Sequence, residues 1–183
     1  YVNLDLADAA LKSFEAESDD VAPGETVSIM EITMRNLMAD GEVDLNDFLS
    51  RADVLATTGH TVMISDFAEY YRLATYLFRY SNRRVRLAMG GMSLLDIFDE
   101  SYYADLDGGI LESFGRLFKN NLKLFIYPYL DPESRQLVTI DTIEVAHNLR
   151  QLFGYLVDRR YIVQLNDINH DYLEIYSPDV LKK

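Results

Sequence analysis

A short glycine-rich segment is the first part of the sequence whose residue types suggest ligand chemistry. It reads Gly90-Gly91-Met92-Ser93 and follows an apolar run, so we expect it to join a strand to a helix. Backbone amides at such a helix start, together with the helix dipole, favour an anion such as a phosphate. The same residues are also typical of a tight turn with an ordinary serine cap, because strand-to-helix turns often need glycine.

Polar residues near the ends of two other apolar runs form a second candidate group. Ser65 and Asp66 stand at the end of one run, and Glu31 lies near the end of another. Hydroxyl and carboxylate oxygens at strand ends can receive the hydroxyl groups of a small ligand. Together with Gly90, Gly91 and Ser93, these three residues are the candidate ligand-binding residues of the chain.

Asp66 and Glu31 each have a structural alternative. Asp66 followed by Glu69 has the spacing of a reciprocal capping box, so Asp66 is expected to cap the next helix. A carboxylate near a buried strand end costs free energy unless it is paired. Arg35 is a candidate partner for Glu31, and the sequence leaves open whether Glu31 forms an ion pair or a site.

Sequence motifs for common catalytic, nucleotide and metal sites are missing. The chain contains neither Gly-x-Gly-x-x-Gly nor a Gly-Lys-Ser/Thr phosphate loop. If Asp105-x-Asp107-Gly108 belonged to a calcium loop, Tyr103 and Phe114 would occupy positions that require carboxylates. With 0 Cys there is no thiolate ligand or nucleophile, and three histidines lack metal-ligand spacing: His60, His147 and His170. The sequence therefore predicts no metal site and identifies neither a cofactor nor a catalytic residue.

The elements that must position the candidate residues are visible as alternating apolar runs and helical patterns. Four runs predict strands: 27–32, 61–65, 85–89 and 122–127. Helical patterns are expected at 67–80, 93–98 and 109–120, and in a long helix that begins at Asp141 or Thr142. Residues 137–140 are a further possible strand, and 161–165 with 172–176 a possible hairpin.

Short apolar strands separated by helices favour a parallel sheet that is covered on both faces. We therefore expect an α/β fold, with a Rossmann-like, mainly parallel sheet and helices on both faces. Ligands of such sheets bind beyond the carboxyl ends of the strands. The candidate site therefore depends on one condition, that these strand ends share a common edge.

Composition restricts the partners. The chain of 183 residues carries a net charge of −13, which repels phosphate backbones, so nucleic acid is not an expected partner. No apolar run approaches the roughly 18 residues of a membrane helix, and no signal-peptide pattern is present. We therefore expect a cytoplasmic protein without a membrane partner.

The acidic residues concentrate at the start of the chain. Residues 1–25 contain seven acidic residues and one basic residue, Lys12. A short amphipathic helix is expected there, followed by a polar stretch interrupted by Pro23-Gly24, which is typical of a linker. We expect residues 1–25 to be a short helix and linker from a preceding N-terminal domain, and 26–183 to form the Rossmann-like domain.

The predicted helix 67–80 carries an aromatic and basic outer face. Arg72, Tyr76, Arg79 and the following Arg83 fall on this face, a mixture that suits a protein interface. The face is also compatible with an ordinary helix surface. It is the basis for expecting a possible homo-oligomer.

Several stretches of the sequence resemble a largely uncharacterised bacterial family, and the resemblance covers about 2–163. The matching stretches are 30–38, 59–66, 69–74, 97–103 and 108–119. Members of this family are commonly labelled TonB-dependent receptor or nicotinamide (nicotinate) mononucleotide adenylyltransferase. The resemblance implies that this chain is the C-terminal part of a longer protein, and it implies no catalytic residue.

Two functions follow as hypotheses. The first is a C-terminal ligand-sensing or interaction domain that binds a phosphate-containing small molecule and contacts the preceding domain of the same protein. The alternative is an enzyme of nucleotide or NAD metabolism, as the family's adenylyltransferase label implies, with an active site shared with the N-terminal part. In that enzyme class a His-x-Gly-His motif binds the nucleotide, whereas here Gly59-His60 follows Thr58 and precedes a predicted strand.

Overall fold

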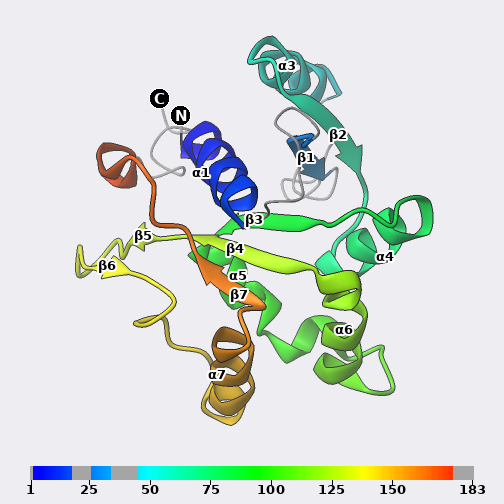
Figure 1. Ribbon diagram of the computed structural model, residues 1–183, viewed down its shortest axis with the longest axis vertical. Helices are drawn as coiled ribbons and strands as arrows, with labels where there is room; N and C mark the ends of the chain where they lie inside the picture. The colour runs from blue at the N-terminus through cyan, green and yellow to red at the C-terminus, as the bar shows by residue number, and fades with distance from the viewer. Residues whose placement is uncertain (1, 18–25, 34–44, 175–183) are drawn as a thin grey trace.

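The structure is a computed structural model that describes residues 2–17, 26–33 and 45–174 (Figure 1). It contains α-helices, short 3-10 helices (η) and mostly parallel strands. In chain order these are α1 (Val2–Ala16), β1 (Ile29–Thr33), α3 (Leu45–Thr57), β2 (Thr61–Ser65), α4 (Tyr70–Tyr80), β3 (Arg86–Gly90), α5 (Gly91–Ile97), η1 (Glu100–Tyr103), α6 (Gly109–Leu117), η2 (Lys119–Asn121), β4 (Lys123–Tyr127), β5 (Tyr129–Leu130), β6 (Leu137–Val138), η3 (His147–Leu149), α7 (Arg150–Asp158), β7 (Ile162–Gln164) and η4 (His170–Glu174).

The strands form small, mainly parallel sheets flanked by helices, consistent with the expected Rossmann-like α/β fold (Figure 1). The first sheet pairs β1 with β2 in parallel, from Ile29 opposite Thr61 to Thr33 opposite Ser65. The second has the order β3-β4-β7, again parallel throughout. A short antiparallel ribbon joins β5 and β6. The predicted parallel direction is therefore confirmed within each sheet, for β1 with β2 and for β3 with β4.

The strands are divided differently from the single layer that the sequence favoured. Among the described residues, no strand pairing joins β1-β2 to β3-β4-β7. The predicted hairpin at the end of the chain is wrong, because β7 pairs in parallel with β4 and His170–Glu174 forms η4. In β7, Ile162 is buried against β4, and this packing outweighs any local preference for a hairpin.

Alternating residues of β4 explain why helices cover both faces of the second sheet. Leu124 and Ile126 belong to a core that contains residues of α4, α5, α6 and α7. Phe125 and Tyr127 point to the opposite face, where they pack with Ala9 of α1. Successive strand residues point to opposite faces, so a strand covered on both sides must be apolar throughout.

Helix α1 is attached to the three-stranded sheet by buried contacts and by polar contacts. Ala9 is only 1% exposed and lies in the core formed with β4. At the start of α1, the Tyr127 hydroxyl donates to Asp5 at 2.6 Å. The helix that the sequence predicted is therefore present, and its contacts join it to the domain expected at 26–183. Residues 18–25, most of the expected linker, lie outside the described residues.

Three predicted helix starts differ from those observed. Helix α4 begins at Tyr70 with Glu69 as its N-cap, so the capping box at Asp66 is wrong. The Phe67 carbonyl instead accepts a hydrogen bond from Thr33 of β1 at 3.4 Å, which holds this segment away from the helical path. Helix α5 starts directly after Gly90, which places Ser93 within its first turn and not at its cap.

The long helix expected from Asp141 or Thr142 is shorter and starts later. The chain forms η3 and then α7, which begins only at Arg150. Before this helix, the Ile143 amide donates to the Thr139 carbonyl in a turn, and Val145 is buried at 7% exposure. Val145 belongs to the main core, and it packs there from a non-helical segment that precedes α7.

Candidate functional site

The ends of β1 and β2 bring two predicted site residues into direct contact. Glu31 pairs with Met63 in the ladder, so Ser65 lies two residues further along the neighbouring strand and on the same face. The Ser65 hydroxyl donates a hydrogen bond to the Glu31 carboxylate. Ser65 is buried at 7% exposure, and its oxygen also accepts a bond from the Phe67 amide at 3.4 Å. Arg35, the other candidate partner of Glu31, lies outside the described residues.

Tyr70 is the next polar side chain near this pair. It lies in the first turn of α4, beyond the end of β2, and the Ser93 side chain on α5 lies near enough to act on its phenol. Burial raises the pKa of the Tyr70 phenol, the Ser93 hydroxyl opposes this, and the negative charges of Glu31 and Asp96 raise it further. The phenol therefore remains protonated and can donate a hydrogen bond.

These contacts define what we call the strand-end cluster: Glu31, Ser65, Tyr70 and Ser93. Glu31 and Ser65 lie on β1 and β2, and Tyr70 and Ser93 lie in the first turns of the helices that follow β2 and β3. Asp96, one helical turn after Ser93, lies beside it; burial raises the pKa of Asp96, and the neighbouring Asp99 raises it further. The cluster supplies hydroxyl and carboxylate oxygens, and the charges that act on its phenol are negative.

Tyr70 was not singled out from the sequence as a site residue. It falls in the predicted helix 67–80, where the sequence drew attention to the outer face with Arg72, Tyr76 and Arg79. The useful signal would have been its position, since the first turn after a parallel strand lies at the carboxyl edge of the sheet.

Gly91 has a packing role in the structure. A Cβ atom at Gly91 would lie 2.7 Å from Cδ1 and 2.8 Å from Cε1 of the Tyr129 ring. At Gly90, by contrast, an added Cβ would meet nothing within 4 Å. The close approach of α5 to β5 therefore explains why position 91 has no side chain, whereas Gly90 carries no such requirement.

Asp66 is exposed in the segment between β2 and α4. Of the six predicted residues, the structure brings Glu31, Ser65 and Ser93 into one group through Tyr70, while Gly90 and Gly91 form the turn that places Ser93.

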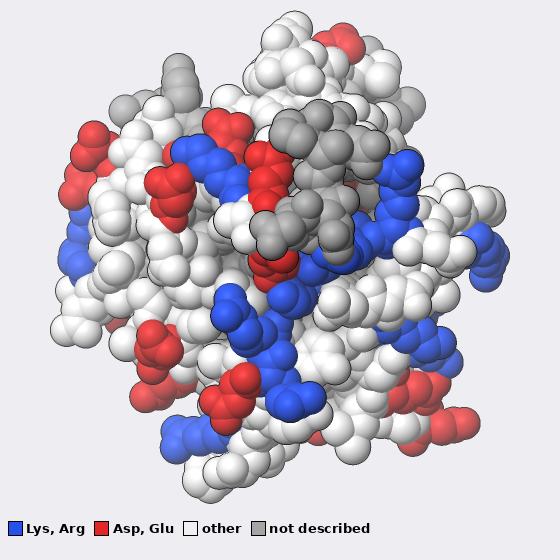
Figure 2. Space-filling model, viewed as in Figure 1, with Lys and Arg blue, Asp and Glu red and all other residues white. Residues whose placement is uncertain are grey.

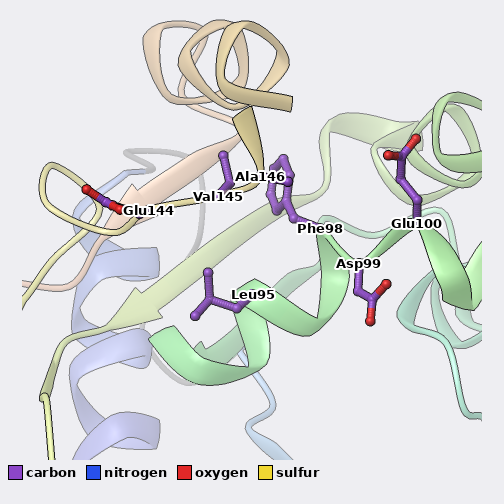
Figure 3. Close-up of a pocket in the computed structure, with 7 residues that line it drawn as sticks. All are labelled: Leu95, Phe98, Asp99, Glu100, Glu144, Val145 and Ala146. Carbon is purple, nitrogen blue, oxygen red and sulfur yellow. The ribbon is translucent and has the colours of Figure 1, made fainter. Parts of the chain in front are cut away.

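A cavity of about 350 Å³ lies on the other side of α5 (Figure 3). Its lining consists of Leu95, Phe98, Asp99, Glu100, Glu144, Val145 and Ala146. The three carboxylates point away from one another in Figure 3. Asp99 accepts a hydrogen bond from the Ser101 amide at 2.9 Å, and Glu100 accepts one from Asn148 at 2.7 Å.

Helical geometry separates this cavity from the strand-end cluster. Leu95 and Phe98 lie on one side of α5, and Ser93 and Asp96 lie on the opposite side, as the 100° rotation per residue requires. Ligand pockets combine an apolar wall with polar groups that converge on one point. The cavity has an apolar wall, but its carboxylates do not converge. The polar side chains that lie near one another are those of the strand-end cluster.

A metal cluster and a membrane-spanning helix are both absent from the described residues. In the part of the chain that the structure describes, no three or more His, Asp or Glu side chains are grouped to hold a metal ion. Within the same residues, no helix has the length and apolar character needed to cross a bilayer.

Comparison of the chain with protein families, with curated proteins and with solved structures finds no match.

Proposed function

We propose that this chain is a ligand-sensing domain and that the strand-end cluster binds a small molecule rich in hydroxyl groups. The observation that carries the proposal is the pair formed by the Ser65 hydroxyl and the Glu31 carboxylate, with Tyr70 nearby. Glu31 on β1 and Ser93, which follows β3, both act on the phenol of Tyr70, which follows β2. Sites at the carboxyl edge of parallel sheets likewise take groups from separate connections.

The chemistry of the cluster favours a neutral polyol, such as a sugar, over a phosphate ester. Serine and tyrosine hydroxyls both donate and accept, and a carboxylate accepts strongly, which matches adjacent hydroxyl groups of a ligand. The negative charges of Glu31 and Asp96, which act on Tyr70, would repel a phosphate. The glycine-rich segment predicts a phosphate ligand, so phosphate esters are included in the test as the alternative to neutral sugars.

Calorimetric titration of the full chain with a panel of simple sugars, their phosphates and nucleotides tests the proposal. We expect at least one neutral sugar to bind, and its phosphate to bind more weakly. The Tyr70→Phe variant removes only the phenolic oxygen and should weaken that binding about tenfold, the equivalent of about one hydrogen bond. Tyr80→Phe is the matched control, because Tyr80 lies on the same helix and is 72% exposed.

Three results would contradict the proposal: no heat from any compound, tighter binding of the phosphates, or unchanged binding by Tyr70→Phe. Turnover of a nucleotide by the purified chain would favour the enzymatic alternative. Since ligand binding without turnover is the expected outcome, product analysis after incubation with nicotinate mononucleotide and ATP completes the experiment.

A further inference from the structure

Basic side chains gather at the edge of the second sheet that lies opposite the strand exits. The parallel strands β3, β4 and β7 all begin at this edge, and each is preceded or opened by Lys or Arg. We call the group the amino-end rim, and its members are Arg83, Arg86, Lys119, Lys123, Arg159 and Arg160. In Figure 2, basic side chains form a band across the middle of the face shown.

The strand register brings these cations together. Arg86 lies directly opposite Lys123 in the ladder between β3 and β4. The Leu124 amide donates to the Tyr161 carbonyl at 2.8 Å, which places Arg160 beside the start of β4. Neighbouring strands are about 4.8 Å apart, so the three strand starts span about 10 Å. The rim therefore concentrates positive charge in a chain whose net charge is −13.

Helix dipoles explain only part of this concentration. Helices α4, α6 and α7 all end at this edge, and cations near helix C-termini are stabilised there. This effect fits Arg159, which is the C-cap of α7. Arg86 and Lys123 lie on strands, however, where no helix dipole favours them.

The rim already holds one carboxylate at its centre. Glu17 accepts hydrogen bonds from Arg86 at 2.9 Å and from Lys123 at 2.5 Å. The side chains of Arg86 and Glu17 are only 7% and 17% exposed. Around this pair, Arg83, Lys119, Arg159 and Arg160 are exposed. A surface that binds a carboxylate at its centre and has exposed cations around it suits a short row of carboxylates.

We propose that the amino-end rim is a docking surface for an acidic segment of a partner protein. Charge complementarity selects the partner, because exposed cations without a described ion pair gain most from nearby carboxylates. An extended segment spans about 10 Å with three or four residues, which matches the width of the rim. A nucleic acid extends much further and would meet the repulsion of the rest of this acidic chain.

A peptide of about six glutamates is the direct probe, with fluorescence anisotropy of the full chain as the readout. We expect binding that weakens as salt is added, since exposed charges are screened. Arg159→Glu should weaken it roughly threefold or more, because one exposed pair becomes repulsive. Arg150→Glu is the matched control: it makes the same charge change on an exposed residue at the other end of α7.

The outcomes separate the alternatives. Binding that is weakened in Arg159→Glu and unchanged in Arg150→Glu supports the docking surface. Equal losses in both variants would indicate net charge alone and overturn the proposal, as would the absence of binding at low salt. Tighter binding of a single-stranded oligonucleotide of the same length would identify a nucleic acid as the partner and overturn the proposal of an acidic protein segment. None of these results depends on the strand-end cluster.

Discussion

Tyr70 takes part in the strand-end cluster because four residues separate the end of β2 from the start of α4. Had α4 started at the predicted cap, Asp66, the phenol would lie in the second turn of the helix. The hydrogen bond from Thr33 to the Phe67 carbonyl delays the helix, and this contact joins residues 34 positions apart. A local capping rule contains no such information, which is why the sequence placed the helix start at Asp66 and not at Tyr70.

The two adjacent glycines offer a matched test of their roles. Gly91→Ala places a Cβ against the Tyr129 ring and should lower the free energy of unfolding by about 1–3 kcal/mol. Gly90→Ala meets open space at a φ of −71° and should remain within about 1 kcal/mol of the wild type. Urea denaturation of both variants measures the difference. Equal stabilities would show that Tyr129 does not require a glycine at position 91.

At the scale of elements, the attachment of α1 to the sheet depends on the charge of Glu17. Burial would raise the pKa of the Glu17 carboxyl, but its hydrogen bonds and ion pairs with Lys123 and Arg86 outweigh burial and lower that pKa. A lowered pKa means that the folded state favours the ionised form. The resulting stabilisation is present above the ordinary glutamate pKa and is lost as the pH falls through the folded value.

Replacing Glu17 by glutamine therefore has an effect that depends on pH. At neutral pH, Glu17→Gln should lower the free energy of unfolding by about 1–2 kcal/mol, since charged hydrogen bonds are replaced by neutral ones. The difference from the wild type should shrink as the pH falls through the folded pKa of Glu17, because the wild-type carboxyl then becomes protonated. Glu15→Gln, at an exposed position of the same helix, is the control. A difference that stays constant with pH would contradict this account.

The elements that could be predicted were those with strong, local patterns. Residues 122–127 are apolar at nearly every position, and β4 is the most buried strand. The tail was predicted wrongly because three residues of β7 carry too little pattern to show their partner. Its pairing depends on β4, which lies about forty residues earlier, and such distant contacts leave no local periodicity.

The whole molecule contains two parallel sheets, and Tyr70 lies in the chain between them. The sequence predicted strands that run parallel within each sheet, yet not the division into two sheets. In β1 and β2, Ile29 and Ile64 remain about half exposed, so this sheet lacks the two-sided covering of β4. The strand-end cluster thus depends on how the two sheets are placed, a property of the folded chain as a whole.

A distance measurement between the two sheets tests this placement most directly. The chain contains 0 Cys, so Ile64→Cys with Met92→Cys would carry two specific spin labels at exposed positions beside Ser65 and Ser93. Double electron–electron resonance, with continuous-wave line broadening for the closest separations, should give one short, narrow distance, because Ser93 lies near enough to act on the Tyr70 phenol, which follows β2. A long or broad distribution in the folded protein would show that these exits do not meet, and would contradict the strand-end cluster.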